Sequence, residues 1–358
     1  MYPKKCSEVA RLSRARTMYQ RNQTAPATSL LAPKTKLLLA VLALLCGGLT
    51  VLPIASIGVP LLAIGVPAFA LLLRDKADPL YLLLLPLGYG LGVAVLDFSQ
   101  LLLPIETLSV FLGGLALGIG LRKHAHRTTL VLLVAAGLSL PFATVYGVQF
   151  VQANGFPDIA MLKGLVSETR AELVQVLLEA VNAVMETIPE ADQALYQSLF
   201  NEASVTETVN MVLICLPAVI VDGVLILSYL ITALYVNAVR LCHVETLLPD
   251  APYMLTMSAP SAILYVVAFL LTTVISLGGA VSAVAINLLL LLLPGFVWLA
   301  GKRFLWRRQN GLLGRWGRTA FFMVIVLLLV NPFGALLLMG LMGAYEEIER
   351  MFRKWKKK

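Results

Sequence analysis

Residues 251–301 have the sequence APYMLTMSAP SAILYVVAFL LTTVISLGGA VSAVAINLLL LLLPGFVWLA G, in which Asp, Glu, Lys, Arg and His are all absent. A membrane-spanning helix needs about 20 mainly apolar residues, so this stretch is long enough for two crossings. Gly278 and Gly279 mark the expected turn between spans over residues 255–277 and 281–301. Basic residues then return from Lys302 onward, which is typical of a cytoplasmic loop under the positive-inside rule. The chain is therefore predicted to be a polytopic membrane protein.

The composition of the whole chain supports lipid as its solvent. The 358 residues are 59% hydrophobic and 13% charged, with a mean hydropathy of +0.86, whereas soluble domains are about 25% charged. The net charge of +8 would favour nucleic acid as the partner of a soluble protein. Here the basic residues cluster beside apolar segments, so they are predicted to orient the chain in a bilayer, and no nucleic-acid partner is expected.

Other apolar runs extend this pattern over most of the chain. The predicted fold is an all-α, polytopic membrane helix bundle of about eight spans, with a broken C-terminal membrane segment and an extracytoplasmic amphipathic helical insert. The expected spans cover residues 37–55, 56–73, 79–96, 103–121, 130–151, 209–239, 255–277 and 281–301. The first two share a very short turn, so a re-entrant arrangement over residues 37–73 is the alternative.

The domain organisation follows from the same runs and from the charge between them. A basic, disordered cytoplasmic tail is expected over residues 1–36, and a second basic cytoplasmic tail over 346–358. A membrane block of five spans covers residues 37–153, and a C-terminal membrane block covers 208–345. The N-terminus is predicted to be cytoplasmic because its tail is strongly basic.

An acidic insert over residues 154–207 separates the two membrane blocks. Apolar residues recur in it at steps of three and four from Leu162 to Ile188, which predicts an amphipathic helix ending near Pro189. Its opposite face is acidic. The insert is expected to lie outside the membrane as one or two helices that cap the spans, with a solvated surface favoured over a cation site.

The last apolar run, residues 319–345, conflicts with a simple crossing. It starts inside by the span count, so one crossing would place the basic residues 350–358 outside, against the positive-inside rule. Asn331-Pro332 falls at its middle, and proline disfavours a continuous helix there. Two half-helices that enter the membrane and return are favoured, and a miscounted earlier hairpin is the alternative.

Small residues spaced four apart predict close helix contacts in the N-terminal block. Gly88 and Gly92 lie in the third expected span, and Gly114 and Gly118 in the fourth. Such spacing lets the backbones of two membrane helices approach closely. These two spans are expected to pack tightly against each other.

Polar residues in or beside the apolar runs are the candidate ligand-binding groups. An acid near the centre of a span is costly, so it must face protein or water, and such groups often mark a site. The candidate pocket would open outward and be lined by Asp97, Glu106, Gln149, Asp222 and Asn287. The structural alternative is that Asp222 and Asn287 bond to each other, or to backbone groups freed by Pro217.

No pattern in the chain indicates catalysis, a cofactor or a metal. The four cysteines show no paired spacing, and His124 and His126 lie among arginines, two positions apart, which is unfavourable for a cation. No phosphate-binding loop, metalloprotease motif or serine-hydrolase motif occurs. The chain is predicted not to be an enzyme.

Several short motifs together resemble the YybS-like family of bacterial multi-pass membrane proteins, a domain of unknown function. The resemblance covers nearly the whole chain after the basic tail, including the acidic insert after the fifth span. Its motifs are Leu216-Pro217, Leu248-Pro249-Asp250, Ala285-Ile-Asn287, Gly343 with Glu346, and Phe352-Arg353. The chain departs from the family near Glu346, where an Asp is usual, and at Leu293-Pro294-Gly295, where a more polar turn is usual.

That family is distantly similar to the substrate-capture subunits of energy-coupling-factor vitamin transporters. The resemblance implies location in the bacterial plasma (inner) membrane, with the lipid bilayer and another membrane protein complex as partners. The first predicted function is therefore a transport-associated protein that binds a small molecule, whose identity the resemblance does not give. The alternative is a structural or regulatory envelope protein that docks partners through its acidic helix or basic ends.

Overall fold

The computed structural model describes residues 31–51, 55–75, 79–96, 105–123, 125–241, 257–273, 280–309 and 315–355. Every regular element in these ranges is a helix and none is a strand, which confirms the all-α prediction. The basic tail expected over residues 1–36 lies almost entirely outside the described residues, as do Asp97 and His124.

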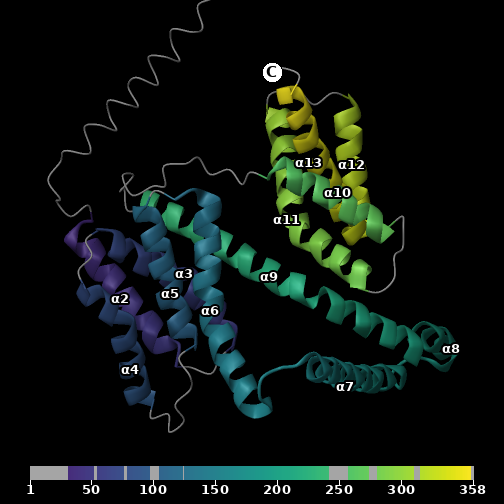
Figure 1. Ribbon diagram of the computed structural model, residues 1–358, viewed down its shortest axis with the longest axis horizontal. Helices are drawn as coiled ribbons and strands as arrows, with labels where there is room; N and C mark the ends of the chain where they lie inside the picture. Colours follow the sequence, from purple (N-terminus) through teal and green to yellow (C-terminus); the bar gives the residue numbers. More distant parts are fainter. Residues whose placement is uncertain are drawn as a thin grey trace, which may run out of the picture. The chain divides into compact units, whose positions relative to one another are not determined.

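The described helices belong to two compact units, shown in Figure 1. The first unit contains α2 (Pro33–Leu49), α3 (Ala55–Asp75), η1 (Pro79–Leu83), α4 (Leu84–Leu96) and α5 (Ile105–Arg122). The second contains α6 (Arg127–Asn154), α7 (Ile159–Met185), α8 (Glu190–Leu199), α10 (Ala259–Thr273), α11 (Ala280–Gln309), α12 (Arg315–Val330) and α13 (Pro332–Trp355). Helix α9 (Glu202–Leu241) belongs to the second unit up to Thr232 and to the first from Ala233.

Four described helices are long and apolar enough to cross a bilayer, which supports a membrane protein. They are α5, residues 128–154 of α6, α9 and α11. The count of about eight spans stays a prediction, because several of the expected spans extend beyond the described residues. Among the other apolar helices, α3 has 21 residues and is about 31 Å long. The apolar stretches Tyr81–Val95 and Ala259–Thr273 are shorter and cover roughly 22 Å, less than the hydrocarbon core of about 30 Å.

The described residues of the charge-free stretch form α10, with 15 residues, and the first part of α11. The expected first span, residues 255–277, lies partly outside the described residues. Met257, just before α10, lies against Gly295 of α11, and the ring of Tyr265 lies 5.2 Å from that of Phe296. Helix α10 packs on both α11 and α13 and lies across α11 (Figure 1).

Glycines allow close backbone contact in the first unit, but between other helices than expected. A Cβ atom on Gly88 would overlap the carbonyl oxygen of Leu44, and one on Gly92 would overlap that of Gly48, so α4 packs on α2. A Cβ on Gly114 would overlap the Phe69 ring, so α5 packs on α3. Contacts between α4 and α5 are few. The glycine spacing indicates close approach but does not identify the neighbouring helix.

The core of the second unit lies where α10, α11 and α13 meet. Tyr265 and Phe296 are fully buried there, and the Tyr265 hydroxyl donates a hydrogen bond to the Leu337 carbonyl oxygen at 3.3 Å. Ala344 of α13 is also fully buried. A Cβ on Gly343 would overlap the Phe296 carbonyl oxygen. Small residues on α13 therefore bring its backbone onto α11.

The C-terminal apolar run is broken at Asn331. Helix α12 ends at Val330 and α13 begins at Pro332, where a proline at the first helical position loses no intrahelical hydrogen bond. The Asn331 side chain caps α13 by accepting a hydrogen bond from the Gly334 N–H at 2.9 Å. The two helices lie side by side (Figure 1).

The acidic insert forms two helices, α7 and α8. Asp158 caps α7 by accepting a hydrogen bond from the Met161 N–H at 2.7 Å. Helix α9 then begins at Glu202, before the start expected at residue 209. With 40 residues it is about 60 Å long, twice the thickness of a hydrocarbon core.

Candidate functional site: a charged cleft between α11 and α13

The charged site is built from the ends of two packed helices. Helix α11 leaves its apolar run at Lys302 and carries Arg303 and Arg307 toward its C-terminus, where the helix dipole favours positive charge. Helix α13 brings Glu346 and Glu347 alongside. Because Gly343 allows the two backbones to touch one turn earlier, the arginines of α11 reach the carboxylates of α13.

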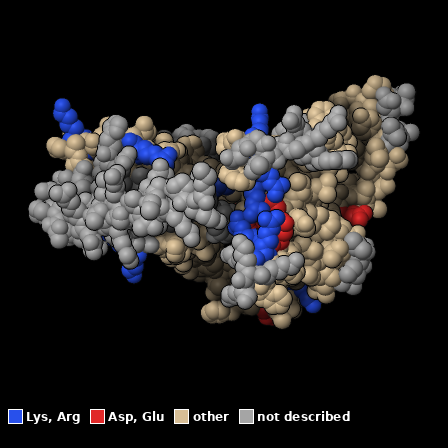
Figure 2. All heavy atoms as spheres, turned by 90° about the horizontal axis from the view of Figure 1, so that it is seen from above, with Lys and Arg blue, Asp and Glu red and all other residues tan. Residues whose placement is uncertain are grey.

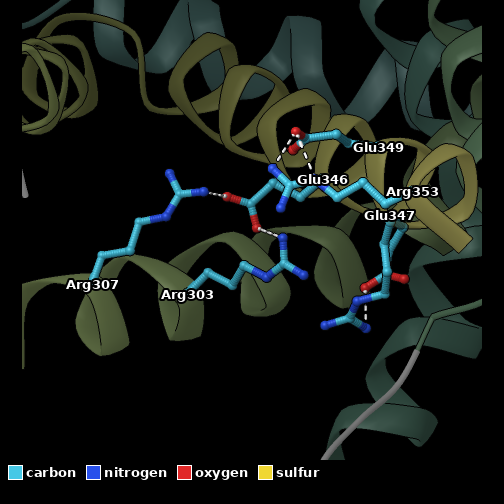
Figure 3. A network of polar contacts seen from close by, with 7 residues as sticks. Arg303, Arg307, Glu346, Glu347, Glu349 and Arg353 are labelled. Atoms are coloured by element: carbon cyan, nitrogen blue, oxygen red, sulfur yellow. Dashed lines mark hydrogen bonds and ion pairs between the residues drawn. The ribbon is translucent and has the colours of Figure 1, made fainter. Parts of the chain in front are cut away.

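Glu346 accepts two guanidinium groups from α11. Arg303 Nη1 lies 2.5 Å from Glu346 Oε2, and Arg307 Nη2 lies 3.3 Å from Glu346 Oε1 (Figure 3). The Glu346 side chain is 13% exposed and that of Arg303 is 24% exposed, whereas Arg307 is half exposed. The pair of Arg303 and Glu346 is thus better shielded from water than the pair of Arg307 and Glu346, and it contributes more to holding α11 and α13 together.

Two further ion pairs lie within α13. Arg350 pairs with Glu347 at 2.9 Å, and Arg353 pairs with Glu349 at 2.6 Å. The hydrogen bond from Arg353 to Glu349, together with the charge of that carboxylate, raises the pKa of Arg353 above its ordinary value. Arg353 therefore keeps its positive charge at the mouth of the site at physiological pH.

These residues surround a cleft of about 450 Å³. It is lined by five basic and three acidic side chains, together with Leu299 and Trp306, so its lining has an excess of two positive charges. The charged lining residues are Lys302, Arg303, Arg307, Arg350, Arg353, Glu346, Glu347 and Glu349. In Figure 2, basic side chains gather around acidic ones over this end of the unit.

The lining indicates binding, and none of its residues is a typical nucleophile. It contains no Ser, Thr, Cys or His, while arginine offers planar donors that match phosphate and carboxylate groups. Within the described ranges, no group of three or more His, Cys, Asp or Glu residues is arranged for a metal ion.

The five residues predicted to line an outward-opening pocket do not come together in one site among the described residues. Asp97 is outside the described residues, and Glu106 lies in the first turn of α5 in the first unit. Gln149 is exposed on α6, and Asp222 is half-buried on α9. None of the five lines the charged cleft or the apolar cavity beside it, both between α11 and α13.

Asn287 has a specific structural environment, next to Pro217 of α9. Its amide nitrogen donates to the Ile214 carbonyl oxygen at 2.6 Å, and its amide oxygen accepts from the Ala218 N–H at 3.0 Å. Ile214 and Ala218 are four residues apart, the spacing at which a helix bonds to itself. The nitrogen also donates to the Ala283 carbonyl oxygen at 2.9 Å. Asn287 thus joins α11 to α9 through backbone groups beside the proline.

The sequence alone favours another interpretation of the cleft residues. Arg303 and Arg307 belong to the basic run after Lys302 that fits the positive-inside rule, and Glu346 occurs only in a family motif. A signal was present: basic residues end one apolar segment, and acidic residues end another soon after Gly340 and Gly343. What the pattern lacked was the pairing of those two segments.

Comparisons of this chain with protein-family models, with curated proteins and with solved structures gave no match. The resemblance to the YybS-like family stays a prediction based on the quoted motifs.

Proposed function

We propose that this protein is a non-catalytic integral membrane protein that docks another membrane protein through α7. This is the structural or regulatory alternative among the functions considered from the sequence. The observation that supports it is that α7, a helix of 27 residues, has no buried residue. A helix that is not buried by the described residues of its own chain and yet carries an apolar stripe is typical of an interaction surface.

The apolar stripe of α7 follows the helical repeat. Six large aliphatic residues lie within about 120° of one another around the helix axis, and their side chains are 38–60% exposed. They are Leu162, Val166, Leu173, Val176, Leu177 and Val184. This stripe would lose its contact with water on binding a partner, and the hydrophobic effect would favour the complex.

The charge beside the stripe indicates the chemistry of the partner. Glu168, Glu172 and Glu179 follow one another at helical spacing along one border of the apolar stripe. The matching partner surface is an apolar groove with a basic rim. A bilayer surface fits less well, because interfacial helices typically carry Lys and Arg and anionic headgroups repel carboxylates.

The test is a site-specific photocrosslink in native membranes. A photoreactive residue at Val176 is expected to capture one membrane protein, whereas the same residue at Asn182, on the polar side of α7, is not. The crosslink should weaken at high salt, because the acidic border steers association. With the photoreactive residue kept at Val176, the double variant Val166→Ser/Leu173→Ser should lose the crosslink with an unchanged unfolding temperature, with Gln175→Ser as control. Crosslinks to lipid alone, or equal crosslinks from both positions, would contradict the proposal.

The transport-associated role implied by the family resemblance predicts different partners when the protein is purified from native membranes and the bound molecules are identified. Recovery of an ATPase, a long-helix coupling subunit and a bound small molecule would favour it over docking without a ligand.

A further inference from the structure

A second cavity lies beside the charged cleft, also between α11 and α13. Its volume is about 720 Å³. The lining is apolar apart from a single lysine: Leu293, Pro294, Val297, Trp298, Gly301, Lys302, Leu305, Leu336 and Met339. A cavity of this size and lining suits the hydrocarbon part of a ligand.

Lys302 lines both cavities. The residues that α11 contributes to the apolar cavity run from Leu293 to Leu305, and those it contributes to the cleft run from Leu299 to Arg307. At 1.5 Å per residue, the centres of these ranges differ by about 6 Å along the helix. The apolar cavity is therefore the deeper in the span, and the charged cleft lies at the end of the span.

We propose that the two cavities together bind one anionic phospholipid. Its phosphate would lie in the cleft, and one acyl chain would lie in the apolar cavity, with the Lys302 ammonium at the junction. The order of the parts matches a lipid in a bilayer, whose headgroup lies at the interface and whose chains extend toward the centre. The proposal does not depend on the docking role of α7.

The ion pairs of the cleft leave donors for a phosphate. Each guanidinium has five N–H donors, and the Arg303 contact with Glu346 uses one of them. Arg307 and Arg350 are about half exposed, so their remaining donors can reach a ligand. Lys302 takes part in none of the ion pairs that the structure shows among the described residues. Basic pockets between membrane helices are a known way of holding anionic headgroups.

A free anion such as inorganic phosphate shares the headgroup chemistry, but it makes no use of the apolar cavity. Trp306, in the lining of the cleft, favours the lipid as well, because tryptophan is enriched where headgroups meet hydrocarbon.

The chain offers a matched pair of variants for each half of the site. A Cβ atom on Gly301 meets nothing within 4 Å, so Gly301→Leu fills the apolar cavity without displacing backbone. Gly223 on α9 is equally open, so Gly223→Leu is its control. Lys302→Gln removes the shared charge, and Lys163→Gln on α7 makes the same change elsewhere. Lys302→Arg keeps the charge and should retain binding.

Native mass spectrometry of the full chain in detergent, titrated with phosphatidylglycerol or phosphatidylcholine, measures the binding. The wild type is expected to bind one phosphatidylglycerol in preference to phosphatidylcholine. Lys302→Gln should weaken this binding about fivefold, as expected for one lysine near an anionic lipid. Gly301→Leu should weaken it at least as much, and both control variants should bind as the wild type does. Unfolding temperatures of all variants serve as the check on folding.

Three results would overturn the proposal. Equal binding of the two lipids would show annular lipid without a site. Full binding by Gly301→Leu would show that the apolar cavity holds no chain. Displacement of the lipid by millimolar inorganic phosphate, with Gly301→Leu again binding as the wild type does, would show a site for free anions.

Discussion

Asn287 and Pro217 act together at the contact between α9 and α11. A proline inside a helix prevents one backbone hydrogen bond and crowds the preceding turn. Here the amide of Asn287 bonds to the Ile214 carbonyl and the Ala218 N–H, which lie on either side of that proline. A polar residue in an apolar span is therefore accounted for by local backbone chemistry.

Asn287→Leu should destabilise the protein because it leaves both backbone groups without their side-chain partner. Hydrogen bonds between membrane helices contribute about 0.6 kcal/mol on average and up to about 1.7, so two bonds predict a loss of roughly 1–3 kcal/mol. Reversible unfolding in mixed micelles measures it. In a Pro217→Ala background the turn is no longer crowded by the ring, so the Ala218 N–H can bond to the Ile214 carbonyl within α9, and the loss should shrink. An equal loss in both backgrounds would contradict the proposed bridge.

Glu346 holds two arginines of α11 in a partly shielded position, so Glu346→Gln is expected to cost more than removal of a surface charge. The contacts of charged groups contribute about 1.5–3 kcal/mol when shielded, and partial exposure lowers this to about 1–2 kcal/mol. Glu349→Gln is the matched control, because its pair with Arg353 is more exposed, and its cost should stay below about 1 kcal/mol. Chemical unfolding in detergent compares the two, and equal costs would argue against Glu346 as a link between helices.

At the scale of elements, glycines determine how close the helices come. Gly88 and Gly92 on α4 face the backbone of α2, while Gly90 on the same helix has nothing within 4 Å of its added Cβ. The difference arises because residues four apart share a helix face and residues two apart do not.

Gly88→Ala should push α4 away from α2, because its Cβ would overlap the Leu44 carbonyl oxygen. Overpacking of this kind costs about 1–3 kcal/mol. Gly90→Ala should be neutral or stabilising by up to about 1 kcal/mol, since alanine favours the helix. The unfolding temperatures of the two purified variants in detergent provide the measurement. A greater loss for Gly90→Ala would show that another face of α4 packs on α2.

At the scale of the whole molecule, the direction of two helices constrains the topology. Asn287 of α11 meets Ile214 and Ala218 of α9, and further along both helices the Trp298 ring lies 5.7 Å from the Tyr229 ring. Both contacts advance in the same direction along the chain, so α9 and α11 run parallel. This direction predicts that the start of α9, which follows α7 and α8, and the end of α11 lie on opposite sides of the bilayer.

Cysteine labelling tests this arrangement in intact cells. In a variant without Cys6, Cys46, Cys215 and Cys242, Ser167→Cys on α7 should react with a membrane-impermeant maleimide added outside. Gln309→Cys at the end of α11 should react only after permeabilisation, because the basic residues beside it favour the cytoplasm. Asn182→Cys on α7 should match Ser167→Cys. Labelling of Gln309→Cys and Ser167→Cys from the same side would contradict both the topology and the parallel helices.

The limits of the sequence are clearest at the glycines and at the charged ends. The break at Asn331-Pro332 and the amphipathic helix after Asp158 follow from local chemistry, and the structure has both. The partner of Gly88, by contrast, lies about 44 residues away, in a helix that composition does not distinguish from other apolar helices. The pairing of Arg303 with Glu346 likewise depends on two segments meeting.

By itself the sequence determined that the described chain is helical and that lipid is its main solvent, because period and hydropathy are properties of each segment alone. It also placed the helix break at Pro332. Only the tertiary structure decided that four described helices are long enough to span, that α10 lies across α11, and that the charged ends of α11 and α13 enclose a cleft. Those outcomes depend on which side chains pack together. In lipid, apolar helix faces differ little in their tendency to associate, so small residues and paired polar groups determine which faces meet.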